Sequence, residues 1–183
     1  MSRCLIAVVA FTAVAFVPVC QAAWCNPLEP KTLPQFEDWV ANWFSEVPQG
    51  RPEDLVRASH PPLLLDVREL AEFAVSHLAG AIQVDPDASL AEVRSLIGPN
   101  RRGEPVLFYC SVGFRSSRLA QRVQAGLLAD GATEVASLRG GIFAWANANR
   151  PMVNAEGTTN AVHPYDDCRA RLLKPAVPTV KRR

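Results

Sequence analysis

Short runs of consecutive apolar residues alternate along the middle of the chain with longer segments that are apolar on one side only. The clearest runs are Leu63-Leu64-Leu65 and Val106-Leu107-Phe108-Tyr109, and continuous apolar runs of this kind are typical of buried parallel strands. The pattern predicts strands at 63–67, 81–84, 105–109 and 134–137, and helices at 52–58, 69–75, 89–97, 115–129 and 141–149. Strands that alternate with helices on short connections predict an α/β domain with a central, mainly parallel sheet flanked by helices.

A further helix is predicted before this domain. Phe36, Trp39 and Trp43 recur at intervals of three and four residues within the segment 35–44, which is the spacing of one helical face. We interpret the segment as an amphipathic helix of an N-terminal extension, residues 23–49, that packs on the domain. A role of this aromatic face in binding a partner is the alternative.

The remaining organisation follows from length and composition. The chain has 183 residues, of which 49% are hydrophobic and 20% are charged, close to the average of a globular protein. This length accommodates one domain, expected at 50–155, with terminal extensions. From Thr158 the sequence is polar and rich in proline, which predicts an extended or partly disordered C-terminal tail at 156–183.

The formal net charge of +1, without a basic stripe, argues against a nucleic-acid partner.

Residues 1–22 have the composition of a secretory signal peptide. Arg3 precedes an apolar stretch at 5–19, and the small residues Ala22-Ala23 follow at a suitable cleavage site. An uncleaved membrane anchor is the alternative, but the stretch is shorter than the roughly 20 apolar residues that span a bilayer. We therefore expect export, to a periplasm or out of the cell, with no stable membrane association after cleavage.

The cysteine count bears on this expectation. Two of the five cysteines, Cys4 and Cys20, lie in the predicted signal peptide, and Cys25, Cys110 and Cys168 remain. In an oxidising compartment an odd number suggests one disulfide and one free thiol. Because Cys25 and Cys168 lie in the two extensions, a disulfide between them would leave Cys110 free. The alternative is that both are reduced or exposed.

Cys110 occupies a position that favours reactivity. The predicted strand 105–109 leads directly into it, Gly113 allows a tight turn, and a helix is predicted from Arg115. A strand–loop–helix junction gathers unpaired backbone N–H groups and the positive end of the helix dipole, which favour a thiolate and hence a nucleophile. An inert buried thiol is the alternative.

Three motifs that occur in order over residues 50–155 resemble the signatures of rhodanese-like domains. They are Leu65-Asp66-Val67-Arg68 with Glu72-Phe73 and His77-Leu78-Ala79-Gly80-Ala81-Ile82, then Cys110-Ser111-Val112-Gly113-Phe114-Arg115-Ser116, and finally Leu138-Arg139-Gly140-Gly141-Ile142-Phe143-Ala144-Trp145 with Arg150-Pro151. The second is similar to the active-site loop of single-domain sulfurtransferases. Ser76 departs from the glycine usual before the histidine, which affects a turn rather than the chemistry. The resemblance implies a three-layer rhodanese-like fold.

The resemblance also implies sulfur transfer with Cys110 as the nucleophile. Its thiolate would attack a sulfane sulfur, hold it as a persulfide and yield it to a thiophilic acceptor. The donor would be a small anion such as thiosulfate, and the acceptor would be a thiol, cyanide or a protein that accepts sulfur. No cofactor is expected. The residues expected to bind the substrate are Ser111, Val112, Gly113, Phe114 and Arg115, through converging backbone N–H groups and the Arg115 guanidinium, together with Arg68.

The length of the loop separates two activities of this fold. Related phosphatases place five residues between cysteine and arginine, because a longer loop encloses a tetrahedral phosphate. Here Arg115 is the fifth residue after Cys110. The shorter loop favours a sulfur atom over phosphate.

Asp66, Arg68 and His77 of the first motif have structural roles as their expected or alternative interpretation. Asp66 ends a predicted strand and is expected to support the structure, by fixing Arg68 or capping the next helix. Arg68 has two open interpretations, a structural partner of Asp66 or a cation that faces the site. His77 is expected to be a turn or packing residue. Cys110 has no nearby cysteine or histidine in the sequence, so no metal site is expected.

Two rival functions stay open. A non-catalytic binding module would explain the aromatic helix and the tail, although it would have no need for Cys110. A thiol-redox or persulfide-relay protein would use Cys25 or Cys168 to resolve an intermediate on Cys110.

Overall fold

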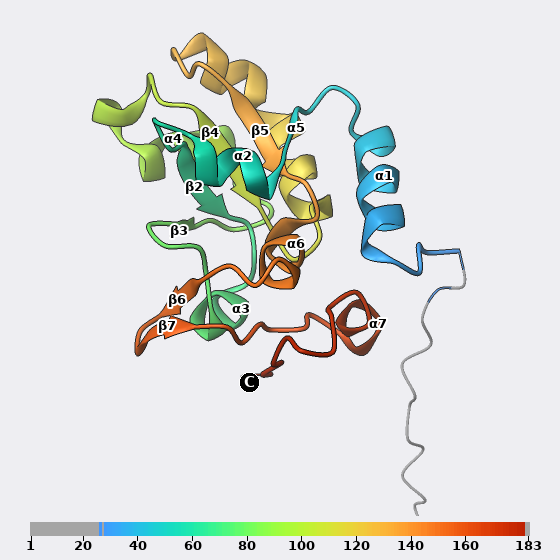
Figure 1. Cartoon of the computed structure of the whole chain (residues 1–183). Coiled ribbons are helices and arrows are strands. Elements are labelled where there is room, and N and C mark those ends of the chain that lie inside the picture. The colour runs from blue at the N-terminus through green and yellow to red at the C-terminus, as the bar shows by residue number, and fades with distance from the viewer. Residues whose placement is uncertain (1–25, 27, 182–183) are drawn as a thin grey trace, which may run out of the picture.

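The computed structural model describes Asn26 and residues 28–181, drawn in colour in Figure 1. The predicted signal peptide, residues 1–22, and Cys25 lie outside the described residues. Within the described part of the chain, no helix is long and apolar enough to cross a membrane. A central sheet flanked by helices confirms the predicted α/β fold.

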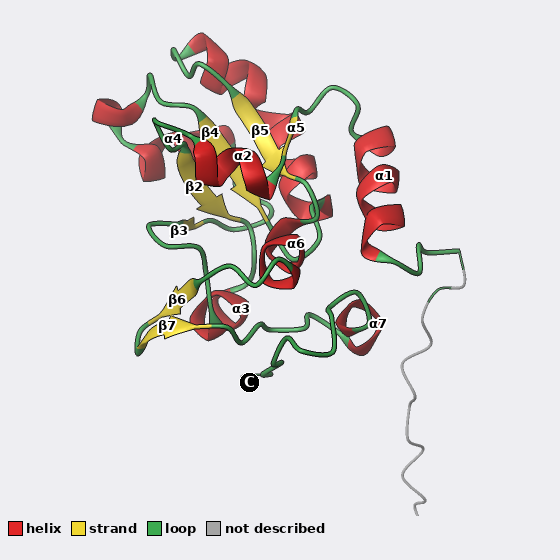
Figure 2. Cartoon of the chain, viewed as in Figure 1, coloured by secondary structure: helices red, strands yellow, loops and turns green. Residues whose placement is uncertain are grey.

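Five strands form the central sheet (Figure 1 and Figure 2), and all of their pairings are parallel, in the order β1-β5-β4-β2-β3. The strands are β1 (Gln49–Gly50), β2 (Leu63–Asp66), β3 (Ile82–Gln83), β4 (Val106–Tyr109) and β5 (Val135–Leu138). Every residue of β4 is buried, because β4 lies between β2 and β5 and is covered on both faces. This explains the apolar run that predicts β4. β1 is not predicted, because two residues carry no periodic pattern.

Helices precede, connect and follow these strands, and all but one short 3-10 helix are predicted by the sequence. They are α1 (Leu33–Trp43), α2 (Pro52–Arg57), α3 (Leu70–Val75), α4 (Leu90–Ile97), the short 3-10 helix η1 (Pro99–Arg101), α5 (Phe114–Ala129) and α6 (Gly141–Asn147). α5 buries Leu119, Val123 and Leu127 at intervals of four, which gives it one apolar face against β4 and β5. Gly126 lets α4 approach closely, since a Cβ there would lie 2.3 Å from the Leu90 side chain.

The C-terminal segment folds onto the domain, which corrects the expectation of an extended or partly disordered tail. It forms an antiparallel hairpin and a short helix, namely β6 (Met152–Asn154), β7 (Gly157–Thr159) and α7 (Asp167–Ala170). Val162, Leu172 and Leu173 are buried in the core. Their spacing follows neither a helical nor a strand period, so the sequence pattern does not reveal them. The expected boundary at 155–156 falls in the turn of the hairpin.

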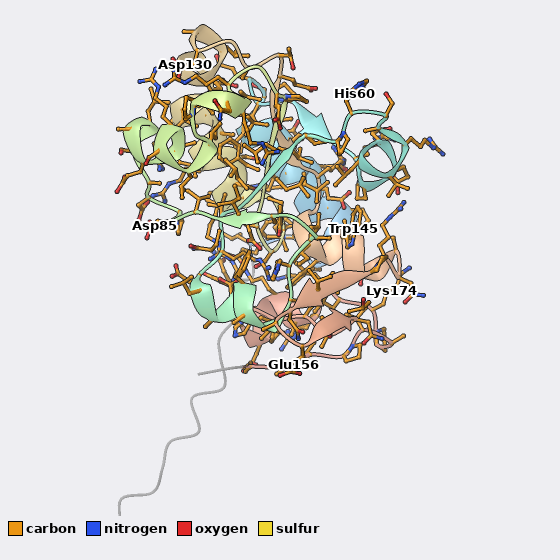
Figure 3. The ribbon with its side chains drawn as sticks, turned by 90° about the vertical axis from the view of Figure 1, so that its left-hand side faces the viewer. His60, Asp85, Asp130, Trp145, Glu156 and Lys174 are labelled. Atoms are coloured by element: carbon orange, nitrogen blue, oxygen red, sulfur yellow. The ribbon has the colours of Figure 1, made fainter. Side chains whose placement is uncertain are left out.

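Hydrogen bonds hold this segment against α6. The backbone N–H of Lys174 donates to Asn147 Oδ1 at 2.7 Å, and Lys174 Nζ donates to the Asn147 carbonyl at 2.8 Å. Figure 3 shows Lys174 on the same side of the molecule as Trp145, whose indole N–H donates to the Pro151 carbonyl at 2.9 Å. The segment that follows α7 is therefore fixed to the end of α6.

The carboxyl edge of the sheet brings distant loops together. Parallel strands all end at the same edge, which is where α/β proteins place their ligand sites. Asp66 at the end of β2 pairs in register with Tyr109 at the end of β4. The segments that begin at Val67 and Cys110 therefore start side by side.

Candidate active site

Cys110 lies at the predicted junction between β4 and α5. Its side chain is buried, and its Sγ accepts a hydrogen bond from the Gly113 backbone N–H at 3.2 Å. Gly113 is the N-cap of α5 and has a φ of +99°, a conformation that glycine adopts without strain. The short loop thus curls back on itself and directs a backbone donor at the sulfur.

The start of α6 holds this loop from outside. The N–H groups of Ile142 and Phe143 donate to the carbonyls of Cys110 and Ser111, at 2.9 and 3.1 Å. Gly141 permits the approach, because a Cβ at this position would lie 2.3 Å from the Cys110 carbonyl oxygen. Gly141 of the third motif therefore lets the start of α6 fix the backbone orientation of the loop that carries the cysteine.

Arg115 and Glu72 form a nearly buried ion pair beside the loop. Arg115 Nη1 donates to Glu72 Oε2 and Nη2 donates to Oε1, both at 2.8 Å. The Ser111 hydroxyl donates to Glu72 Oε1 at 2.9 Å and accepts from Arg115 Nη2 at 3.1 Å. Such a two-pronged pair is both strong and geometrically specific. The arginine of the second motif is thus held in place by a glutamate of the first.

The charges of this pair stabilise each other. Burial alone raises the pKa of the Glu72 carboxyl, but the hydrogen bonds and charge of Arg115, with the Ser111 hydroxyl, outweigh burial and hold that pKa below its ordinary value of 4.5. Burial likewise opposes the charge of Arg115, while the Glu72 carboxylate and the sulfur of Cys110 raise the pKa of Arg115. Both groups are therefore ionised at neutral pH. In the sequence Glu72 is visible only as part of a motif, and no local pattern predicts its role.

Arg68 lies elsewhere, which corrects its expected role in substrate binding. Its guanidinium is wholly buried and donates to Asp66 Oδ1 at 2.9 Å, to Asp66 Oδ2 at 2.6 Å and to the Ser76 carbonyl at 2.6 Å. Neither these partners nor Arg68 line the pocket over Cys110. Asp66 and Arg68 together form an internal ion pair that ties β2 to the end of α3.

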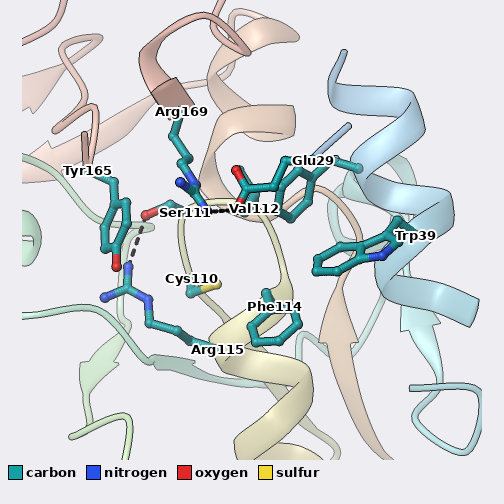
Figure 4. Close-up of a pocket in the computed structure, with 10 residues that line it drawn as sticks. Glu29, Trp39, Cys110, Ser111, Val112, Phe114, Arg115, Tyr165 and Arg169 are labelled. Carbon is teal, nitrogen blue, oxygen red and sulfur yellow. Dashed lines mark hydrogen bonds and ion pairs between the residues drawn. The ribbon is translucent and has the colours of Figure 1, made fainter. Parts of the chain in front are cut away.

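A pocket of about 180 Å³ lies over Cys110 (Figure 4). Its walls come from the loop after β4, from α1 with the segment before it, and from the segment around α7. The lining residues are Glu29, Phe36, Trp39, Cys110, Ser111, Val112, Phe114, Arg115, Tyr165 and Arg169. The structure thus gathers most predicted residues of the second motif around the pocket, and adds residues from both extensions that no sequence pattern predicts there.

One wall of the pocket is aromatic. Trp39 of α1 stacks on Phe114 with a ring separation of 5.4 Å and an interplanar angle of 13°. Phe36 meets Trp39 edge to face at 5.2 Å, and Phe44 meets Phe114 in the same way. The amphipathic helix therefore packs on the domain and shapes the pocket through Phe36 and Trp39, whereas Trp43 of the predicted face is 65% exposed. The periodicity predicts this face but not its location.

The opposite wall carries charge. The Arg115 guanidinium lies over the Tyr165 ring, 4.7 Å from its centre. Arg169 of α7 donates to Glu29 at 2.8 Å and to Asp166 at 3.0 Å (Figure 4 shows the pair with Glu29). The C-terminal segment and the segment before α1 thus meet above the cysteine.

The two cysteines in the described residues differ in state. Cys110 is a free thiol, and Cys168, next to Arg169, is disulfide-bonded. Cys25, the predicted partner of Cys168, lies outside the described residues, so the pairing stays a prediction. The described residues contain no group of three histidine, cysteine, aspartate or glutamate side chains that could hold a metal ion.

Comparison with known proteins assigns the family. A family model described as the Rhodanese-like domain matches residues 51–148. The chain belongs to the rhodanese-like family. The matched region of this rhodanese-like chain includes Glu72, Cys110 and Arg115, whereas Glu29 and Arg169 lie outside it.

Two relatives and one solved structure are similar to part of this chain. A sulfurtransferase of Allochromatium vinosum is 37% identical over 95 residues, which cover 52% of this chain and 81% of that protein. The uncharacterized protein YqhL of Bacillus subtilis is 34% identical over 82 residues, 45% of this chain and 59% of that protein, so the match spans less than two thirds of YqhL. Among solved structures, thiosulfate sulfurtransferase from Pseudomonas aeruginosa has a TM-score of 0.51 at 24% identity, over 65% of this chain and 22% of that chain, a likeness that shows the fold alone.

Proposed function

We propose that this rhodanese-like protein is a sulfurtransferase that carries sulfur as a persulfide on Cys110. The observation that supports this most is the free Cys110 thiol beneath a pocket, with the Gly113 N–H directed at its sulfur. The similarity to a sulfurtransferase covers most of that relative and agrees with the proposal.

The reaction divides into two balanced steps. In the first, the Cys110 thiolate attacks the outer sulfur of a donor such as thiosulfate, the sulfur–sulfur bond of the donor breaks, and sulfite leaves with the electron pair. In the second, cyanide or a thiolate attacks the outer sulfur of the persulfide, and the electron pair returns to Cys110 Sγ. The Gly113 N–H lies where it stabilises negative charge on Sγ before the first step and after the second.

Arg115 supports this chemistry from a fixed position. Glu72 and Ser111 hold its guanidinium next to the loop, so its charge acts on the sulfur without a reorganisation of the side chain. The ring from Cys110 to Arg115 is one residue shorter than the loops of related phosphatases, which supports sulfur rather than phosphate as the group transferred.

Mass spectrometry of the intact protein tests the proposal. After incubation with thiosulfate, we expect the protein to gain one sulfur atom, which cyanide removes with release of thiocyanate. Cys110→Ser and Cys110→Ala should neither gain the atom nor form thiocyanate. If the wild-type protein gains no sulfur, or if Cys110→Ala turns over equally fast, the proposal is wrong.

Export is a separate proposal. The composition of residues 1–22 supports it, and so does the disulfide at Cys168, because disulfides persist in oxidising compartments. Expression of the full chain in bacteria, followed by fractionation and N-terminal sequencing, tests it. A mature protein that begins at about residue 23 in the periplasm or the medium is expected; an intact N-terminus in the cytoplasm would contradict it.

A further inference from the structure

The pocket over Cys110 contains two arginines whose carboxylate partners differ in accessibility. Arg115 is paired through both of its terminal nitrogens with Glu72, whose side chain is 3% exposed. A ligand that drew Arg115 away would leave a buried carboxylate without its cation, which is strongly unfavourable. Arg115 therefore does not leave Glu72 to pair with a ligand.

Arg169 is held differently. Its partner Glu29 is 26% exposed and accepts through one oxygen, at 2.8 Å from Arg169 Nη2. Ion pairs between partly exposed groups contribute little, so the Glu29 carboxylate is free to exchange this contact for water. Asp166 keeps Arg169 in place when Glu29 leaves, because it accepts from Arg169 Nη1 at 3.0 Å and from the Arg169 backbone N–H at 2.7 Å.

The side of the pocket opposite Tyr165 offers apolar surface to a ligand. Trp39 and Phe36 from α1 line it together with Phe114 of the active-site loop. In Figure 4 Glu29 and Arg169 lie above Cys110, with the Trp39 ring to one side. A carbon skeleton can pack on these rings while an anionic group reaches Arg169. An inorganic donor such as thiosulfate has no carbon skeleton to use this surface.

We propose that Arg169 is a substrate-binding residue for the carboxylate of a small organic thiol that accepts sulfur, and that Glu29 occupies the place of that carboxylate in the free protein. The proposal rests on the proposed function for its chemical step. Arg169 and Glu29 lie outside the family match at 51–148, so the selectivity belongs to the extensions of this chain rather than to the rhodanese-like domain.

The chemical step balances without a further reactant. The thiolate of the acceptor attacks the outer sulfur of the Cys110 persulfide and forms a new sulfur–sulfur bond. The bond between that sulfur and Cys110 Sγ breaks, and its electron pair stays on Sγ as the thiolate. The proton of the persulfide remains on the transferred sulfur, so the product is the hydropersulfide of the acceptor.

Alkylation of Cys110 tests the anion site independently of sulfur transfer. Iodoacetate and iodoacetamide alkylate a thiolate by the same displacement of iodide, but only iodoacetate carries a carboxylate. The readout is the ratio of the two rate constants, measured at Cys110 by peptide mass spectrometry. We expect Arg169→Gln to lower the iodoacetate-to-iodoacetamide ratio by about tenfold and Glu29→Gln to raise it by about threefold.

Arg171→Gln is the matched control, because it removes the same charge two residues away at an exposed position that does not line the pocket. Its ratio should stay near the wild-type value. An unchanged ratio in Arg169→Gln, or an equal fall in Arg171→Gln, would overturn the proposal. A ratio that does not rise in Glu29→Gln would overturn the role of Glu29.

Turnover then tests the acceptor class. With thiosulfate as donor, 3-mercaptopropionate is compared with the uncharged 2-mercaptoethanol. The ratio of kcat/KM for the carboxylate thiol to that for the neutral thiol should fall about tenfold in Arg169→Gln. No change in this ratio would overturn the assignment. If neither the wild-type protein nor any variant transfers sulfur, but the alkylation ratios shift as expected, the proposed function is wrong. The anion site at Arg169 is then still supported.

Discussion

Both carboxylate oxygens of Glu72 accept hydrogen bonds from Arg115, each at 2.8 Å, across 43 positions of the sequence. This contact joins the first and second motifs and fixes the arginine next to the loop of Cys110. It also means that a carboxylate of the protein balances the charge of Arg115. Arg169, from the C-terminal extension, is the cation that we propose for binding a substrate.

Replacement of Glu72 should destabilise the fold. Glu72→Gln removes the negative charge of a nearly buried pair and leaves Arg115 without its counter-ion, so we expect the free energy of unfolding to fall by about 2 kcal/mol. Urea denaturation measures the change. Asp87→Asn is the matched control, because Asp87 pairs with Arg118 at an exposed position and its loss should have little effect. Equal changes in the two variants would show that the Glu72–Arg115 pair stabilises the fold no more than an exposed ion pair does.

The same pair should make stability depend on pH. The folded-state pKa of Glu72 lies below its ordinary value of 4.5, so ionised Glu72 stabilises the fold above that value. This contribution is lost as the pH falls through the lowered folded-state pKa. The difference in unfolding free energy between the wild-type protein and Glu72→Gln should therefore be largest near about pH 7 and shrink toward about pH 3. Urea denaturation at a series of pH values measures it; a constant difference would contradict the assignment.

Gly141 should be intolerant of a side chain. It has a φ of +55°, and a Cβ there would lie 2.3 Å from the Cys110 carbonyl oxygen. Gly141→Ala should lower the free energy of unfolding by about 3 kcal/mol more than Gly80→Ala. Gly80 is the control because it also has a positive φ, +76°, but no atom lies within 4 Å of its Cβ position. Thermal or urea denaturation compares the two, and similar losses would mean that the loop moves aside.

Removal of Trp39 should open the pocket. Trp39 stacks on Phe114 and forms part of the wall over buried Cys110. In Trp39→Ala the rate of Cys110 alkylation by iodoacetamide should rise about threefold or more, because access no longer requires the wall to open. Trp43→Ala is the control on the same helix, since Trp43 is 65% exposed. An equal effect of both variants would indicate a general loosening of α1.

Peptide mapping without reduction should separate the enzyme from a redox relay. Cys168 is disulfide-bonded and Cys110 is free, so we expect a Cys25–Cys168 bridge and an unmodified Cys110. The bridge would tie the two extensions together next to the Glu29–Arg169 pair. A bridge that involves Cys110 would instead favour the thiol-redox alternative.

The sequence by itself determined four of the five strands of the central sheet, most helices and the place of Cys110 at the end of a strand. The runs that became β2 and β4 are continuous because both faces of these strands are covered, and such a pattern is local. The position of Cys110 between a strand and a glycine turn is likewise readable from adjacent residues. Each of these features depends on neighbours within a few positions, where periodicity and turn chemistry carry the information.

Only the tertiary structure decided which residues surround Cys110. Arg68, two positions after the end of β2, is turned inward to Asp66, while Glu72 reaches the loop. Glu29 and Arg169 meet across 140 positions and close the pocket from opposite ends of the chain. No local period encodes such a pair, because its geometry results from the packing of both extensions on the domain.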